Sequence, residues 1–155
     1  MRIRLAGCGD LDFLEKLLYQ VAAVHADIRP DLFKRGAKKY TREALEALLK
    51  DEDRPVFVAE DGDRKLGYAF CVLEKHVGDG AMQDFTSLYI DDLCVDECAR
   101  GRHVGQTLYE YVKGYAREKG CKSITLNVWQ GNDAARAFYD KMGLVPLKTT
   151  LEARL

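Results

Sequence analysis

The chain has 155 residues, with 24 Lys and Arg against 25 Asp and Glu and a formal net charge of -1. With 47% hydrophobic residues it can bury roughly 70% of its unfolded surface on folding, which excludes a disordered chain and a stapled mini-protein. Charged residues of both signs make up 32% of the chain, so no broad basic face is expected, and we expect no nucleic-acid partner.

No apolar run approaches the roughly 18 residues of a membrane span, and Met1–Gly7 lacks the apolar core of a signal peptide. We therefore expect a cytoplasmic protein with no membrane partner. The five cysteines are odd in number and mostly set among apolar neighbours, which favours reduced thiols over a disulfide framework. Cys94, Cys98 and His103 do not make up the four tightly spaced ligands of a structural zinc site, so no metal is expected.

The first third of the chain predicts one strand and two helices. Alternating apolar and basic residues indicate a short strand over Met1–Leu5. Apolar residues spaced by three or four predict a helix from Leu11 that ends before Pro30, with Asp10 as its N-cap. Thr41 is expected to cap the second helix.

Three strands are predicted next. Pro55–Glu60 and Lys65–His76 flank a tight turn and should pair antiparallel. Phe85–Val95 forms a long strand that is charged only at Asp91 and Asp92. Because neighbouring side chains of a strand point to opposite faces, at least one of these carboxylates should face a cleft or a packed helix.

The last third returns to a helical period. An amphipathic helix is predicted from His103 to Gly120, followed by a strand over Ser123–Trp129. Asn132 should cap a further helix that Gly143 closes, and Leu144–Leu155 is expected to supply a last strand. The order of elements predicts one mixed α/β domain over residues 1–155.

The segment from Asp91 to Gln106 has the pattern of an anion site: a strand, a basic turn with glycines, then a helix. The first turn of a helix offers unpaired N–H groups and a favourable dipole to a phosphate. Gly101 and Gly105 would let the backbone approach the ligand, and two arginines, Arg100 and Arg102, could bond its oxygens. Alternatively, one glycine serves only the turn and the other only packs against a strand.

This segment is neither a P-loop nor a dinucleotide-binding fingerprint. It resembles the signature of the GNAT superfamily of acetyl-CoA-dependent N-acetyltransferases, which Arg100–Gly105 matches at both ends. The family's middle glycine is His103 here; in a right-handed helical conformation its side chain would be tolerated and its N–H still offered. The resemblance continues through these residues: Leu93, Cys94, Val95, Asn132, Ala135, Phe138, Tyr139, Met142, Gly143 and Leu144.

The resemblance implies a GNAT-like acyl-CoA N-acyltransferase fold, in which helices flank a central mixed, mostly antiparallel sheet. It also implies acetyl-CoA as acyl donor. Its pantetheine arm would pair with the main chain of the strand end, although Leu93 and Val95 also suit core packing, and Asn132 suits an N-cap as well as the arm. The implied donor-binding residues are Leu93, Cys94, Val95, Arg100, Gly101, Arg102, His103, Val104, Gly105, Gln106 and Asn132.

Three side chains are candidates for the chemistry. Tyr139 stands where the family places a tyrosine that can protonate the leaving thiolate, although it could merely pack beside Phe138. The strand around Asp91 and Asp92 is similar to that of polyamine acetyltransferases, where adjacent acids hold a cationic amine and assist its deprotonation. We favour Asp91 for the cleft, with Asp92 as its weaker partner or a structural acid; both could instead only pair with basic side chains.

These residues predict an N-acetyltransferase that moves an acetyl group directly to a primary amine, with a small or polyamine-like acceptor favoured. Alternatives are acetylation of a protein N-terminus or lysine, and a non-catalytic acyl-CoA sensor. The connector His25–Lys34 either walls the acceptor site, as is common in the family, or is a solvated loop around a buried Phe33. Dimers are common in the family, and Leu147–Leu155 could pair between subunits of a homodimer.

Overall fold

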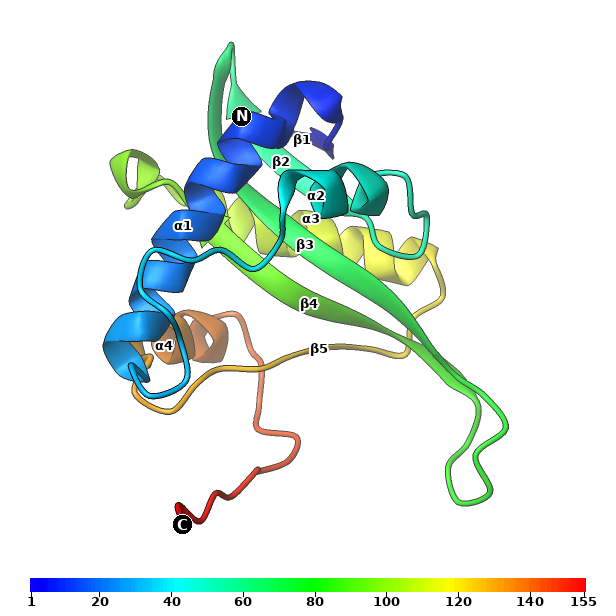
Figure 1. The fold of residues 1–155 in the computed structure, drawn as a ribbon. Coiled ribbons are helices and arrows are strands. Elements are labelled where there is room, and N and C mark those ends of the chain that lie inside the picture. Colours follow the sequence, from blue (N-terminus) through cyan, green and yellow to red (C-terminus); the bar gives the residue numbers. More distant parts are fainter.

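A five-stranded sheet forms the centre of the molecule in a computed structural model that describes all of residues 1–155 (Figure 1). Its strands lie side by side in chain order, and all neighbours pair antiparallel except the parallel pair at the end of the sheet, β4 and β5. The prediction of a mixed, mostly antiparallel sheet flanked by helices is confirmed. The strands are β1 (Arg2–Leu5), β2 (Val56–Asp61), β3 (Arg64–His76), β4 (Phe85–Val95) and β5 (Ser123–Leu126).

Helices cover both faces of this sheet. One face carries α1 and α2, and the other carries α3, with α4 beside the ends of β4 and β5 (Figure 1). The predicted caps are confirmed at two helices, where Thr41 accepts a hydrogen bond from the Ala44 N–H and Asn132 accepts one from the Ala135 N–H, each at 3.2 Å. The helices are α1 (Leu11–Ile28), α2 (Arg42–Leu48), α3 (Val104–Glu118) and α4 (Asp133–Lys141).

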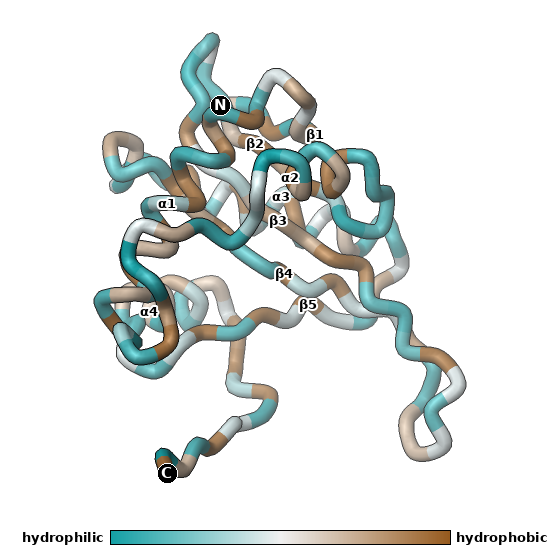
Figure 2. Tube along the Cα trace, in the orientation of Figure 1, coloured by the Kyte–Doolittle hydropathy of each residue, from teal (hydrophilic) through white to brown (hydrophobic).

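The central strands are apolar on both faces because each face has its own layer of helices. In β2, Val56 and Val58 pack under α1 and α2, whereas Phe57 and Ala59 pack under α3. Burying each large side chain of this kind contributes about 1.5–3 kcal/mol. Hydrophobic colouring follows β2 and β3 through the middle of the sheet, and part of β4 interrupts it with a hydrophilic stretch (Figure 2). That stretch is where the candidate site lies.

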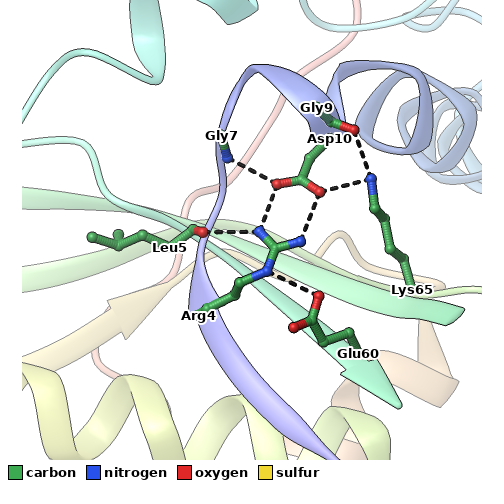
Figure 3. Close-up of polar contacts among 7 residues, drawn as sticks. All are labelled: Arg4, Leu5, Gly7, Gly9, Asp10, Glu60 and Lys65. Atoms are coloured by element: carbon green, nitrogen blue, oxygen red, sulfur yellow. Dashed lines mark hydrogen bonds and ion pairs between the residues drawn. The ribbon is translucent and has the colours of Figure 1, made fainter. Parts of the chain in front are cut away.

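Asp10 does not have the capping role predicted from the sequence. Its side chain makes no capping bond to α1; it turns to the start of the chain and accepts bonds from the Gly7 N–H at 2.8 Å and from Arg4 at 2.7 and 3.0 Å (Figure 3). Lys65 lies 2.7 Å from the same carboxylate. Hydrogen bonding from Arg4 therefore holds the pKa of Asp10 well below its usual range. The network ties β1 and the start of α1 to β3.

The predicted last strand is absent. Residues 144–155 form no helix or strand, and after α4 they run away from the sheet to the C-terminus (Figure 1). The apolar side chains that alternate along this segment stay outside, with Val145 82% and Leu151 89% exposed. The preceding strand is also shorter than predicted, since β5 ends at Leu126. Alternation specifies which face a strand would bury but does not bring the segment to an edge, and the outer edge of β5 stays without a partner strand.

The end of β4 is open on one side. Its pairing with β3 continues to Val95, whereas its pairing with β5 stops at Ile90 opposite Leu126. From Asp91 onward, the edge of β4 that faces away from β3 therefore has no strand beside it. No helix of the protein combines the length and the apolar character that crossing a membrane requires.

Candidate active site

The open edge of β4 lies between two groups of functional side chains. Where β4 and β5 separate, one side-chain hydrogen bond still connects them: the Asn127 side chain donates to the Tyr89 hydroxyl at 3.1 Å. Leu93 and Val95 pack against the core under α3, while Cys94 is buried on the face of α1. Side chains of this strand end thus serve the core, and its main chain is left for the open edge.

A β-bulge in β4 places two carboxylates on one face of the sheet. Ile90 pairs with Cys71 and Asp92 pairs with Phe70, so Asp91 is the extra residue between them. The strict alternation expected from the sequence is therefore wrong at this point. Both carboxylates contact residues on the face covered by α1 and α2, because Asp91 meets Tyr40 and Asp92 meets Tyr68. The bulge concentrates negative charge beside the open edge.

Asp91 is held by the segment that connects α1 to α2. It accepts a hydrogen bond from the Tyr40 hydroxyl at 2.6 Å and lies 2.5 Å from the Lys39 ammonium group. Tyr40 itself stacks on Phe70 with ring centroids 5.8 Å apart, and burial raises the pKa of its hydroxyl. Only 13% of the Asp91 side chain is exposed. Asp91 therefore does pair with a basic side chain, as one of the two alternatives from the sequence anticipated.

Asp92 is partly buried and has no basic partner within ion-pair distance. Its carboxylate accepts one hydrogen bond, from the Tyr68 hydroxyl at 2.6 Å, and Tyr68 is fully buried. Burial raises the pKa of Asp92 to about 6, because a desolvated carboxylate resists ionisation, although the Tyr68 bond opposes the shift. A carboxylate with this pKa can accept and release a proton near neutral pH.

Tyr139 lies on α4 and is half-buried. Its ring packs against Phe138 at 5.0 Å, so the packing alternative from the sequence does hold for its ring. Burial and, secondarily, the charge of Asp92 raise the pKa of its hydroxyl. The phenol is therefore protonated at neutral pH and can act only as a proton donor.

The turn at the start of α3 presents a row of unpaired backbone donors. The N–H groups of residues 101–106 donate to no backbone acceptor, and the first helical bond is from Thr107 to His103. Beside them lies a hollow of about 270 Å³. It is lined by Val95, Ala99, Arg100, Gly101, His103, Val104, Gly105, Gln106, Phe138, Lys141 and Met142.

His103 has a left-handed backbone, with φ 60° and ψ 16°, and the right-handed conformation expected from the sequence is wrong. It is the only residue other than glycine with positive φ. A side chain in this region costs about 1–2 kcal/mol, which explains why a glycine suits the position. Gly101 also has positive φ, at 75°, so it does serve the turn. A Cβ on Gly105 would lie 3.4 Å from Phe138, so this glycine also serves close packing between α3 and α4.

Three basic side chains lie near the hollow; two of them line it, and the third is paired with an acid elsewhere. Arg100 and Lys141 both line it. Arg102 instead donates to Asp61, the last residue of β2, at 3.1 Å. Lys141 was not predicted from the sequence. It is the last residue of α4 and lies beside Phe138 and Met142, which also line the hollow. This arrangement becomes evident only once α4 is known to lie against the start of α3.

The connector between α1 and α2 also contacts the segment between β5 and α4. Phe33 of the α1–α2 connector packs edge-on against Trp129 at 5.3 Å and lies 5.1 Å from His25. Phe33 is only partly buried, and its contacts link the connector to the segment between β5 and α4. Four residues were not singled out from the sequence, because each lies far along the chain from the residue that it contacts: Lys39, Tyr40, Tyr68 and Trp129.

Comparison with known proteins agrees with this geometry. The model of a family described as "Acetyltransferase (GNAT) family" matches residues 21–144. N-alpha-acetyltransferase 30 of Schizosaccharomyces pombe is 30% identical over 94 residues, which are 59% of this chain and only 58% of that protein.

Solved structures extend the similarity to the whole chain. A mutant of the BH1408 protein from Bacillus halodurans is 30% identical, with a TM-score of 0.95 over 100% of this chain and 99% of that chain. An aminoglycoside acetyltransferase from an uncultured soil metagenomic sample, solved in complex with sisomicin, is 19% identical. It has a TM-score of 0.74 over 99% of this chain and 94% of that chain, a likeness that concerns the fold alone.

Proposed function

Because this chain belongs to the acetyltransferase (GNAT) family, we propose that it transfers the acetyl group of acetyl-CoA directly to a primary amine. One observation carries the proposal. The open edge of β4 leads at one end to the unpaired N–H groups of residues 101–106 and at the other to the carboxylates of Asp91 and Asp92. An anion site and an amine site thus lie at the two ends of one unpaired stretch of backbone.

The turn at the start of α3 holds the pyrophosphate of the donor. Its N–H groups and the dipole of α3 favour a negative group, and the side chains of Arg100 and Lys141 add positive charge. These groups fit a phosphate because their donors have no competing acceptor in the backbone. Arg102 would have to leave Asp61 to take part.

The strand end orients the acyl group. Main-chain groups of Leu93, Cys94 and Val95 pair with the pantetheine arm as a neighbouring strand would, and their N–H groups polarise the thioester carbonyl. Asn132 keeps its cap role, since its side-chain oxygen bonds to the Ala135 N–H, and its amide nitrogen is left for the arm. The Cys94 thiol is not a nucleophile, because burial raises its pKa to about 12.

Asp92 takes the proton from the incoming ammonium group. Its pKa of about 6 lies near the pH of the reaction, whereas Asp91 is engaged by Lys39 and Tyr40. This assignment reverses the ranking of the two acids that we favoured from the sequence. Tyr139 then donates its proton to the thiolate that leaves when the C–S bond breaks. The remaining rate enhancement comes from positioning the two reactants.

The acceptor is a small primary amine or a polyamine-like cation. Two carboxylates on one face attract and hold an ammonium group, and Tyr40 supplies aromatic surface beside them. A peptide N-terminus is the second candidate, supported by the 30% identity to N-alpha-acetyltransferase 30. The unpaired cysteines suit a reducing compartment, and we propose the cytoplasm as the site of the reaction.

The test measures donor binding and acetyl transfer separately. Calorimetric titration with acetyl-CoA reports binding, and release of free thiol with polyamines, amino acids and peptides side by side reports transfer. We expect micromolar binding and amine-dependent thiol release. Binding without release on any amine would favour an acyl-CoA sensor, and a folded protein that binds no acetyl-CoA would overturn both functions.

Tyr139→Phe tests the proposed acid. The variant keeps the ring that packs on Phe138 and removes only the hydroxyl. We expect kcat to fall about tenfold or more while the Kd for acetyl-CoA stays unchanged. A positioned general acid typically accelerates a reaction roughly 10²–10⁴-fold, and water can replace part of that effect. Equal kcat in the two proteins would remove Tyr139 from this role.

A further inference from the structure

Lys39 places a primary amine of this chain where the proposed acceptor amine is held. Its Nζ lies 2.5 Å from Oδ1 of Asp91, and the Lys39 side chain is 49% exposed. The lysine side chain is an alkylammonium ion, which is the chemical class of acceptor that the proposed function names. Asp91, which holds this amine, is two residues before Leu93, so about 7 Å of strand separates the Cα atoms of Asp91 and Leu93, where the main chain is proposed to hold the thioester.

The connector that carries Lys39 is fixed at both sides of this lysine. Tyr40, the next residue, donates to the other oxygen of Asp91 at 2.6 Å and receives a hydrogen bond from Arg54 at 3.1 Å. Earlier in the connector, Phe33 packs against Trp129 at 5.3 Å. A tethered amine held in this way reaches a far higher effective concentration at the site than an amine in solution.

We propose that Lys39 is a self-acetylation site, an inference that rests on the proposed function. The Lys39 ammonium group loses a proton to Asp92 or to water, and its nitrogen forms a bond to the acetyl carbonyl carbon. The C–S bond of acetyl-CoA breaks, and the departing thiolate takes the proton of the Tyr139 hydroxyl. The nitrogen, now bonded to the acetyl carbon, gives its second proton to solvent, and solvent returns a proton to the Tyr139 oxygen. Acetyl-CoA and the lysine ammonium thus yield acetyl-Lys39, free CoA thiol and one proton.

Acetylation at this position would alter the acceptor site. Acetyl-lysine is neutral, so it no longer forms an ion pair with Asp91. Both carboxylates of the bulge then become available to an external ammonium ion. The modification would therefore act as priming: the first acetyl group removes the internal amine that competes for Asp91.

The experiment follows acetylation of each lysine by peptide mass spectrometry after incubation of the full chain with acetyl-CoA, together with thiol release on an amine panel. Lys75 is the matched control, because it pairs with Asp53 at 3.0 Å and is 59% exposed but lies away from the open edge of β4. Lys39→Arg keeps a cation beside Asp91 and cannot be acetylated under these conditions. Asp91→Asn keeps the shape of the side chain and removes its charge.

We expect Lys39 to be acetylated about tenfold or more faster than Lys75, with a first-order rate that does not change when the protein is diluted. Asp91→Asn should bring the Lys39 rate toward that of Lys75, and prior acetylation should raise kcat/KM for an external amine in the wild type but not in Lys39→Arg. Transfer to an external amine while Lys39 reacts no faster than Lys75 overturns this inference and leaves the proposed function intact. Lys39 reacting no faster than Lys75 in a protein that also acetylates no amine overturns both.

Discussion

At the turn of residues 101–106 the donors come from one continuous stretch of backbone, whereas at the bulge of β4 the carboxylates meet side chains from two other segments, the α1–α2 connector and β3. The first group exists because a helix begins there and leaves its N–H groups unpaired. The second requires a register shift between β3 and β4 and a connector that reaches across to Asp91. The proposed donor end is therefore built mainly from backbone, and the proposed acceptor end mainly from side chains.

This difference has a consequence for how each end responds to substitution. Backbone donors survive most side-chain changes, so variants at the donor end should alter affinity in moderate steps. Side chains at the acceptor end have individual roles, so removal of one should have a large effect on turnover and little effect on donor binding. The four predictions below test this contrast.

The largest effect is expected at the acceptor end, with Asp92→Asn. The amide can still accept the Tyr68 hydrogen bond but cannot take a proton. We expect kcat/KM for the amine to fall about 10²–10³-fold, with an unchanged Kd for acetyl-CoA. In the wild type, kcat/KM should rise with pH through about 6, the pKa of Asp92, and the variant should lack this limb. A pH profile that keeps the limb in Asp92→Asn would assign the base elsewhere.

At the donor end, single charge removals should weaken binding without changing the pattern of acceptors. Arg100→Ala or Lys141→Ala should each raise the Kd for acetyl-CoA about tenfold, because each removes one charged group that lines the hollow. Arg102→Ala is the matched control, since this arginine is paired with Asp61, and its effect should stay below about threefold. Titration calorimetry measures all three, and an equal loss in Arg102→Ala would show that the Asp61 pair opens to the donor.

Asp92 should also reduce stability, which Asp92→Asn can reveal without any substrate. Its pKa is raised from 3.8 to about 6, so the folded protein binds more protons than the unfolded chain between these values. The stabilisation by the protonated acid is fully present below pH ~4 and is lost as the pH rises through about 6. At pH 8, we therefore expect the variant to gain roughly 1–2 kcal/mol in free energy of unfolding, and this gain should shrink on acidification. Urea titrations at several pH values test the sign.

The smallest effect is expected for His103→Gly. Glycine accepts the left-handed conformation without the steric cost that a Cβ brings, but it loses more backbone entropy on folding. The net gain in free energy of unfolding should be about 0.5–1 kcal/mol, with donor affinity retained. His103→Ala keeps the Cβ and removes the imidazole, so it should show no such gain. A gain of equal size in both variants would mean that the ring, and not the backbone, carries the cost.

Much of this arrangement was predictable from short-range patterns. The order of strands and helices, the caps at Thr41 and Asn132, and the turn before α3 all follow from residues a few positions apart. Two predictions failed for reasons that lie outside such windows. The Asp10 side chain bonds to Arg4 and Lys65 and not to the N–H groups of α1, and residues 144–155 have the alternation of a strand but pair with no strand.

The proposed acceptor end also depends on residues that are distant in the sequence. Adjacent acids in an apolar strand were a visible signal, but alternation placed them on opposite faces. The bulge brings them to one face, and Lys39, Tyr40 and Tyr68 then become their neighbours. Nothing in the local sequence specifies where β4 shifts against β3, because register depends on the packing of both strands.

The sequence by itself determined the elements, their order, the family to which the chain is similar, and the backbone donors at the start of α3. Only the tertiary structure decided that Asp91 and Asp92 share one face, that His103 is left-handed, and that Lys39 pairs with Asp91, one of the carboxylates proposed to hold the acceptor. The physical reason is the distance along the chain over which each interaction acts. Helix caps and periodicity act over a few residues, whereas strand register, burial and ion pairing depend on segments that meet only after the chain has folded.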